Sequence, residues 1–397
     1  MVTTLQIILL IIMGLFFLTA LGNILNLGKY GIHFFPLGVM FKTEFFNKLL
    51  EKMGEKGKRF WKAIYNIGKI LAGLIALGFL VYFLVNPFLL LFNSPAGSGI
   101  QLIIPGVTMD FKVALLFILP FVLVIIPHEI AHAVMAKREG LEIKASGIFI
   151  LLVLFGGFIE IAKESIEKAT SKSKIRVWMN GSAFNAIFAL IFLILYLLSP
   201  YIVSIGYGAS NGVLITNIFE GSPAEESGLH KGDVIQQITL MNESAYSTNV
   251  TIIENVDDYY TLFTSNFNSS KILISLLNGS NVEATPTNIN PNTNTTSTSQ
   301  LYLGINIHNY LPPKGKRLSV WFPYYWNIEV LYSLNLSVMA VFLNLLPLGI
   351  TDGDKIINEY CEIKEVEDRK KKTIMRSLRL FSLLVIVINL VLSMIKL

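Results

Sequence analysis

Two histidines and a glutamate stand in a His-Glu-x-x-His pattern formed by His128, Glu129 and His132. Histidines four residues apart on a helix share one face, so they can hold one Zn²⁺ while the glutamate acts as a general base. The apolar stretch around them, Val113–Met135, is long enough to cross a bilayer. There each ionisable group costs roughly 2.5–3.5 kcal/mol unless it is paired or binds a metal. The pattern therefore predicts metal-dependent proteolysis within the membrane; the alternative is a histidine pair packed in a helical bundle.

A catalytic zinc site has three protein ligands and one open position, so a further segment must supply the third ligand. The single cysteine, Cys361, excludes a thiolate site and leaves imidazole and carboxylate groups. Asp352 is the best candidate, because it follows an apolar stretch that reaches the same membrane leaflet as His128. Pro347 breaks that stretch, and irregular backbone at membrane depth needs protein or a water-filled cavity around it. Hydrolysis requires water at such a place.

The composition is that of a membrane protein, with 53% hydrophobic and 15% charged residues. The net charge of +5 does not indicate nucleic-acid binding, because the basic residues cluster in loops beside apolar stretches. Windows of about 20 apolar residues predict six membrane spans. These lie at Leu5–Leu25, Ile70–Phe92, Val113–Met135, Ser182–Ile202, Ile328–Leu348 and Leu380–Ile395.

Lysine and arginine are concentrated in the connections after the first, third and fifth predicted spans. Such connections face the cytoplasm, so we expect a multi-pass cell-membrane protein with its N-terminus and the long segment before span five outside. The same orientation places the active site toward the cytoplasmic side. The basic stretch 42–62 fits equally an amphipathic helix on an anionic membrane face and a solvated loop.

Four stretches of the sequence resemble the site-2 protease family of intramembrane zinc metalloproteases. His128–His132 matches the zinc and base motif, and Gly140–Ile161 looks like the membrane-associated β-hairpin that follows it. Asn180–Asn185 resembles the family's Gly-Pro-x-x-Asn element, with Ser182 in place of proline. Asn344–Gly353 resembles its Asn-x-x-Pro…Asp-Gly element at the matching spacing.

The resemblance implies a zinc metalloendopeptidase that cuts a peptide bond within or near a transmembrane helix of a membrane-protein substrate. The implied ligands of one Zn²⁺ per chain are His128, His132 and Asp352, and the implied catalytic residues are Glu129, Asn185 and Asn344. The two asparagines would lie near the substrate or the oxyanion. Asp354, which replaces a second glycine of the family, is a rival ligand. The hairpin edge either clamps an unwound substrate by strand pairing or only shields the site.

The segment 205–314 resembles a PDZ domain, inserted between membrane parts 1–204 and 315–397. The expected elements are a strand, a Gly-Ser-Pro-Ala turn, a short helix and a second strand within Gly212–Ile238, a second helix at Glu254–Phe263, and later strands at Lys271–Leu277 and Tyr302–Asn306. PDZ domains capture extended peptides or C-termini by strand addition. The resemblance therefore implies a domain that restricts or recruits substrates.

The predicted fold is thus a polytopic α-helical membrane protein with about six transmembrane helices and an inserted α+β PDZ domain. Two other functions stay open. One is a non-catalytic membrane scaffold that uses the PDZ domain and a structural zinc, against which the presence of Glu129 argues. The other is a zinc or proton transporter, because intramembrane histidine and aspartate also mark ion pathways. We find no inverted repeat among the predicted spans, which argues against transport.

Overall fold

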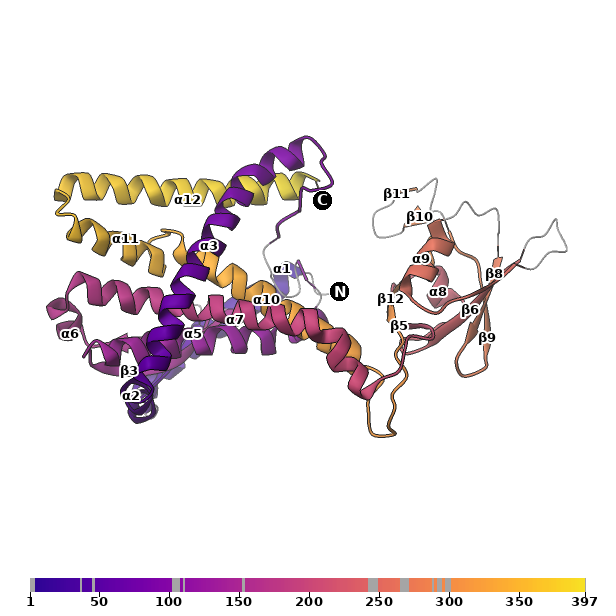
Figure 1. Ribbon diagram of the computed structural model, residues 1–397, viewed down its shortest axis with the longest axis horizontal. Helices are drawn as coiled ribbons and strands as arrows, with labels where there is room; N and C mark the ends of the chain where they lie inside the picture. The colour runs from indigo at the N-terminus through magenta and orange to yellow at the C-terminus, as the bar shows by residue number, and fades with distance from the viewer. Residues whose placement is uncertain are drawn as a thin grey trace. The chain divides into compact units, whose positions relative to one another are not determined.

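The computed structural model describes residues 4–35, 38–44, 47–101, 108–109, 111–151, 154–241, 249–264, 271–287, 289–290, 295–296 and 301–396. The chain divides into two units (Figure 1). One unit joins Met1–Tyr196 to Ile328–Leu397 and contains most of the apolar helical residues, and the other is Leu197–Asn327.

Five helices of the described chain are long and apolar enough to cross a membrane. They are α3 (Lys58–Leu91), α5 (Ile118–Arg138) with the short α4 (Phe111–Leu116) before it, α7 (Ser171–Gly206), α10 (Phe322–Leu345) and α12 (Asp368–Lys396). The first predicted span falls on α1 (Thr4–Ile24), which is counted as a shorter apolar helix over Met13–Ile24. These helices confirm a helical membrane protein.

Three of these helices begin well before the apolar spans predicted from hydropathy. They begin at Lys58, Ser171 and Asp368 rather than at Ile70, Ser182 and Leu380. A hydropathy window detects only the apolar part of a helix, whereas lysine and arginine are good helix formers and let it continue into the polar region. In the first unit, these helices therefore extend into polar sequence before their apolar spans begin.

A four-stranded antiparallel sheet accompanies the helices of the first unit, in the order β1-β2-β3-β4. Its strands are β1 (Ile32–Phe35), β2 (Gly38–Thr43), β3 (Ile143–Leu151) and β4 (Leu154–Ile161). The hairpin predicted within Gly140–Ile161 is confirmed as β3–β4. Strands β1 and β2, which were not predicted from the sequence, extend this hairpin. The 3₁₀ helix η1 (Leu27–Tyr30) lies just before β1.

The basic stretch 42–62 forms the end of β2, the helix α2 (Asn47–Glu55) and the start of α3. Helix α2 packs against α5, where Leu50 is buried together with Ala133 and Ile143. The Asn47 amide donates to the Ile143 carbonyl of β3 over 3.2 Å. The stretch therefore contains a helix, as the first of the two interpretations predicted, and Leu50 on this helix packs inside the protein.

The second unit is built on a sheet with strand order β12-β5-β6-β8-β9, to which β7 adds by pairing with β6. Its elements are β5 (Val213–Ile218), α8 (Pro223–Glu226), β6 (Val234–Met241), β7 (Asn249–Ile252), α9 (Val256–Thr264), β8 (Lys271–Leu276), β9 (Asn281–Ala284) and β12 (Ile305–Asn309), with a separate β10 (Ile289–Asn290) and β11 (Thr295–Thr296). Ile215, Ile235, Ile274 and Phe263 lie in one core between sheet and helices.

The predicted strands and helices of this unit are present, with one shift. The last strand begins at Ile305 and not at Tyr302, because Gly304 adopts a left-handed conformation with φ 84°. A Cβ at Gly304 would lie 2.1 Å from the Cβ of Ser222, so the turn requires glycine. In the first unit, α6 (Lys163–Lys168) and α11 (Asp352–Ile363) complete the elements.

Candidate active site

The His-Glu-x-x-His pattern lies within helix α5, as its spacing predicts. His128 and His132 are buried, at 7% and 6% exposure, on one face of the helix. Pro127 precedes them inside the same helix and removes one backbone hydrogen bond there. Helix α5 therefore presents both imidazoles to the interior of the first unit.

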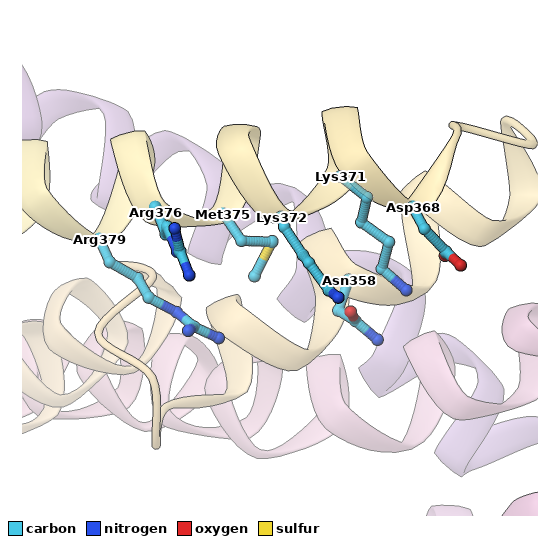
Figure 2. Close-up of a pocket in the computed structure, with 7 residues that line it drawn as sticks. All are labelled: Asn358, Asp368, Lys371, Lys372, Met375, Arg376 and Arg379. Carbon is cyan, nitrogen blue, oxygen red and sulfur yellow. The ribbon is translucent and has the colours of Figure 1, made fainter.

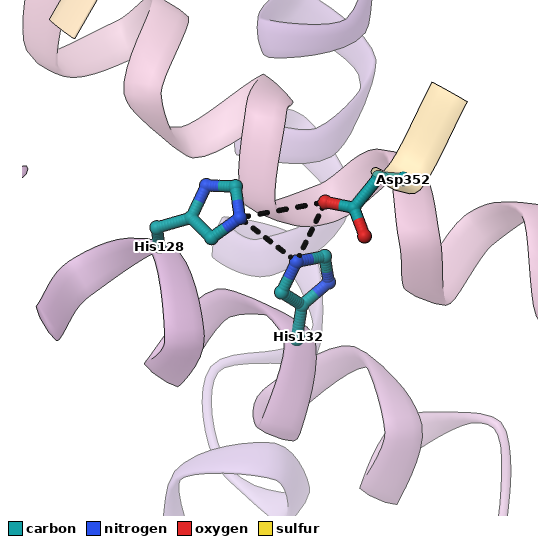
Figure 3. Close-up of side chains that lie close together, drawn as sticks. All are labelled: His128, His132 and Asp352. Carbon is teal, nitrogen blue, oxygen red and sulfur yellow. Dashed lines mark hydrogen bonds and ion pairs between the residues drawn. The ribbon is translucent and has the colours of Figure 1, made fainter. Parts of the chain in front are cut away.

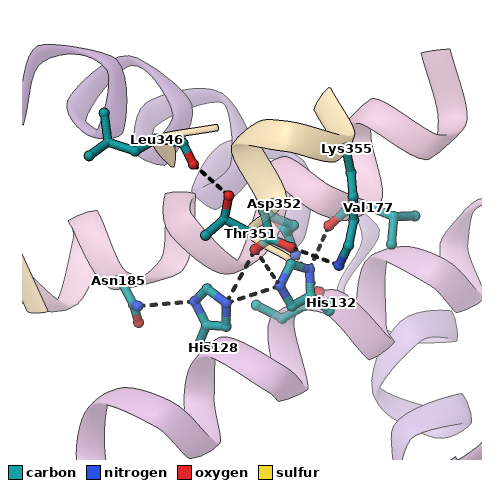
Figure 4. Close-up of polar contacts among 10 residues, drawn as sticks. His128, His132, Val177, Asn185, Leu346, Thr351, Asp352 and Lys355 are labelled. Atoms are coloured by element: carbon teal, nitrogen blue, oxygen red, sulfur yellow. Dashed lines mark hydrogen bonds and ion pairs between the residues drawn. The ribbon is translucent and has the colours of Figure 1, made fainter. Parts of the chain in front are cut away.

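Asp352 is the first residue of α11. A short non-helical segment separates it from α10, which ends at Leu345. The Thr351 hydroxyl fixes this break, since it donates to the Leu346 carbonyl over 2.5 Å and accepts from the Leu348 amide over 3.2 Å (Figure 4). Gly349 lies within the turn at φ 90°. The predicted helix break is therefore present, and it directs Asp352 toward α5.

The three predicted ligands meet at one point (Figure 3). Oδ2 of Asp352 lies 3.0 Å from Nε2 of His132 and 3.4 Å from Nε2 of His128, and the two Nε2 atoms are 3.0 Å apart. A tetrahedral Zn²⁺ with ligands at 2.0–2.1 Å separates its ligand atoms by about 3.3 Å. We call these three side chains the metal-binding group, and their spacing fits one zinc ion.

The outer nitrogens of both imidazoles have partners that determine which ring atom faces the metal position (Figure 4). Nδ1 of His132 lies 2.8 Å from the Val177 carbonyl, to which it must donate. Nδ1 of His128 lies 3.0 Å from the Asn185 amide. If that amide presents its oxygen, the buried and otherwise unpartnered Oδ1 accepts the Nδ1 proton. Both Nε2 atoms are then unprotonated, as ligands require.

The buried Oδ2 of Asp352 receives no hydrogen bond in the described structure. Two imidazole lone pairs and a carboxylate oxygen thus point at each other in a buried place. Such an arrangement is unfavourable without a cation between the atoms. The donor set therefore fits a metal ion, and nitrogen with oxygen is a zinc combination.

The backbone of α7 lies against the metal-binding group at Gly181. A Cβ at Gly181 would lie 2.3 Å from Nε2 of His132 and 2.7 Å from Nε2 of His128. Asn180 ties the same turn to α5 by donating to the Ala131 carbonyl over 2.5 Å. The sequence motif contained Gly181, but its contact with both histidines is a finding of the structure.

Glu129 lies against strand β4 of the sheet. A Cβ at Gly157 would lie 2.7 Å from Cγ of Glu129, so the strand reaches this position because residue 157 is glycine. Strand β4 ends the strand order of the sheet and pairs with β3. The predicted general base therefore stands beside the outer strand of the sheet.

The rival ligand Asp354 has a different partner. Its carboxylate accepts hydrogen bonds from Nε and Nη2 of Arg379 over 2.6 and 2.7 Å. These bonds hold the pKa of the Asp354 carboxyl below its ordinary value. Asp354 is therefore absent from the metal-binding group, and Asp352 is its carboxylate.

Asn344 was predicted from the sequence as a site residue, and Lys355 was not. Asn344 is partly exposed in the last turn of α10 and makes no side-chain hydrogen bond within the described chain. Its role near an oxyanion stays a prediction. Lys355, which the sequence analysis did not name, lies with Nζ 3.4 Å from Oδ1 of Asp352 and 4.4 Å from the Trp178 ring centre. The i,i+3 spacing from Asp352 was its signal in the sequence.

The fold and site combine apolar helices long enough to cross a membrane with three buried side chains that could hold a metal ion. The family description Peptidase family M50 matches residues 116–386, which is more than half of the chain. This chain therefore belongs to peptidase family M50, the site-2 protease family, as the sequence resemblance predicted.

Two curated relatives are similar to parts of this chain. A membrane-bound transcription factor site-2 protease homolog of Arabidopsis thaliana is 23% identical over 201 residues, which cover 49% of this chain and 38% of the relative. An uncharacterized protein of Methanocaldococcus jannaschii is 34% identical over 122 residues, 30% of each chain. The chain thus spans less than two fifths of the length of either relative.

Proposed function

We propose that this protein is an intramembrane zinc metalloprotease, which hydrolyses a peptide bond within or near a transmembrane helix of a membrane-protein substrate. One observation carries the proposal: His128, His132 and Asp352 direct three ligand atoms at one buried point, with distances of 3.0–3.4 Å between them. Glu129 adjoins His128 in the same helix. Membership of peptidase family M50 supports the same reaction class.

The reaction adds water across the scissile amide. Zn²⁺ supplies Lewis-acid chemistry when bound, polarising the carbonyl and making water acidic near neutral pH. Glu129 accepts a proton as the water oxygen bonds to the carbonyl carbon, and then gives this proton to the amine nitrogen as the C–N bond breaks. Asn185 holds His128, and we assign Asn344 to the negatively charged oxygen.

Substrate must be extended at the scissile bond, because a helix encloses its own peptide groups. Strand β4 offers an outer edge next to Glu129, and extended peptides bind to such edges by main-chain hydrogen bonds. We therefore assign substrate clamping to β4, in preference to simple shielding. The position of Gly157 against Glu129 supports this assignment.

The segment 205–314 is assigned as the PDZ domain, which restricts or recruits substrate by binding a peptide or a C-terminus. Its support is the sheet with helices α8 and α9 around one core, and the Gly-Ser-Pro-Ala turn that leads from β5 into α8. The distribution of basic residues supports an orientation with this domain and the N-terminus outside and the metal-binding group toward the cytoplasm.

The test uses the purified full chain in lipid with single-span substrates, together with zinc analysis of the same samples. Glu129→Gln should abolish cleavage, by at least about 100-fold, while zinc stays bound. Asp352→Ala should reduce the zinc content. Glu164→Gln, at an exposed position on α6, is the matched control and should cleave like wild type.

Three results would contradict the proposal. Undiminished cleavage by the Glu129→Gln protein would remove the base role, and zinc binding without cleavage of any single-span substrate would favour a membrane scaffold. Zinc uptake into vesicles, abolished by Asp352→Ala, would favour transport instead.

A further inference from the structure

A polar cavity that does not include the metal-binding group lies between α11 and the first turns of α12 (Figure 2). Its volume is about 410 Å³. Four of its lining residues are basic, and they project from α12 toward α11, where Asn358 faces them (Figure 2). The basic residues are Lys371, Lys372, Arg376 and Arg379. We call this cavity the basic pocket.

Two of the four cations have partners, and two do not. Lys371 is paired with Glu362, and Arg379 with Asp354. Lys372 and Arg376 are exposed and make no ion pair within the residues that the structure describes. They stand four residues apart on one face of α12, where like charges repel each other. An anion between them would offset that repulsion.

The donors of the basic pocket suit a phosphate group. The ammonium of Lys372 and the guanidinium of Arg376 offer charged donors, and guanidinium binds phosphate through two parallel hydrogen bonds. The amide of Asn358 adds a neutral donor from α11. The wall contains a single carboxylate, that of Asp368, at the start of α12.

The sequence of α12 after the pocket distinguishes a lipid phosphate from a soluble one. The helix becomes apolar directly after Arg379, and its apolar side chains there are exposed, Leu380 at 58% and Phe381 at 44%. Leu383 and Leu384 continue this surface at 52% and 48% exposed. The basic pocket thus adjoins the apolar part of a helix long enough to cross a membrane, where we expect lipid headgroups, and the exposed apolar side chains of α12 can contact acyl chains.

The opposite face of the same helix provides a contrast. Arg369 and Lys370 line a surface made by residues 367–374 alone, with no second element around it. Lys370 is already paired with Glu367 over 3.5 Å. This face has fewer available cations and no opposing donor, so we expect weaker anion binding there.

We propose that the basic pocket binds the phosphate of an anionic phospholipid. Lys372 and Arg376 contact the phosphate, Asn358 donates to it from α11, and the acyl chains follow the exposed apolar face of α12. The site would be occupied whenever the chain lies in a membrane with anionic lipid, whether or not the metal-binding group is intact.

The experiment measures binding of fluorescent phosphatidylglycerol to the purified full chain in a neutral detergent. The Lys372→Gln/Arg376→Gln protein should bind at least about 30-fold more weakly than wild type, since each variant side chain loses a charge-assisted contact with the phosphate, which contributes about fivefold or more. The Arg369→Gln/Lys370→Gln protein loses the same charge from the same helix and should bind like wild type. Phosphatidylcholine should not compete, and inorganic phosphate at matched ionic strength should not displace the lipid.

Equal weakening in both double variants would overturn the proposal, because it would show general charge attraction. Displacement by inorganic phosphate at the concentration of the lipid would also overturn it, in favour of a soluble phosphate. Both double variants alter exposed side chains, and equal melting temperatures will show that they fold alike.

Discussion

Two clusters of buried polar side chains lie in the first unit. In one cluster the polar atoms form hydrogen bonds with each other and with the backbone, and in the other cluster several polar atoms have no partner. Between α3 and α12, the Asn86 amide donates to Oδ1 of Asn389 over 2.9 Å, and Asn389 donates to the Phe83 carbonyl over 2.7 Å. Ser393 donates to the Asn389 carbonyl and accepts from the Ile100 amide. We call these residues the asparagine network.

The metal-binding group and its surroundings contain the opposite case. Asp352 Oδ2, Asn180 Oδ1 and Ser182 Oγ are buried without a hydrogen-bond partner in the described structure. A buried polar atom without a partner costs free energy. The comparison teaches that the asparagine network is complete without any added group, whereas the metal-binding group leaves buried polar atoms that a bound ion or water would satisfy.

The largest expected effect comes from filling the space beside the histidines. Gly181→Val places carbon where both Nε2 atoms are within 2.7 Å, so the ligands must move and zinc should be lost. We expect cleavage to fall by at least about 100-fold, since small displacements of reacting groups have effects of that order. Zinc content and cleavage rate are the measurements. The control is Gly73→Ala on α3, where no atom lies within 4 Å of the added carbon.

A smaller effect is expected behind His128. Asn185→Ala removes the group that orients the imidazole, and such outer partners typically contribute 10–100-fold to metal affinity. A zinc titration with a competing chelator measures this change at constant pH. If Asn185 acted on the oxyanion alone, zinc affinity would stay at the wild-type value while the cleavage rate fell.

A substitution in the asparagine network should lower the stability of the fold and leave zinc binding unchanged. Asn86→Leu removes the donor to Oδ1 of Asn389 and both partners of the Ser98 backbone, at a cost of about 1–3 kcal/mol in unfolding free energy. Zinc content per folded protein should stay unchanged, as measured beside thermal unfolding in detergent. The double variant Asn86→Leu/Asn389→Leu should lose less than the sum of the single changes. Loss of zinc in Asn86→Leu would erase the distinction between the two clusters.

The smallest effect concerns a partly exposed charge on the sheet. The Lys42 ammonium beside Glu160 holds the pKa of that carboxyl below its ordinary value. A lowered folded-state pKa contributes stability above the unfolded value of about 4.3, and this contribution disappears as the pH falls below it. The melting temperature of wild type should therefore drop more between pH 6 and pH 3 than that of Glu160→Gln. Equal drops would show that the pair contributes nothing.

Much of the site followed from the sequence because its signals are periodic or chemical. His128 and His132 needed only helical spacing, and Asp352 needed the lengths of two spans. The contacts of Gly181 and Val177 could not be predicted, because one has no side chain and the other acts through its backbone carbonyl. Such contacts depend on how α7 packs on α5, which no local pattern encodes.

The fold shows the same division. Apolar runs predicted the membrane helices and the family resemblance implied the β3–β4 hairpin, whereas the pairing of β1 and β2 onto this hairpin was missed. These strands lie about a hundred residues before their partner, and short strands after an apolar helix carry little pattern of their own. Helix α2 was ambiguous because the same amphipathic face suits a lipid surface and a protein neighbour.

The closeness of α7 at Gly181 has a stereochemical consequence for catalysis. Backbone closes one side of the three ligands, so a scissile carbonyl has to arrive from another direction. Under the proposed clamping along β4, water would attack a single prochiral face of that carbonyl, and a peptide paired with the strand presents this face in one chain polarity. The proposal therefore predicts that reversing the N-to-C direction of a substrate in the membrane lowers the rate of cleavage.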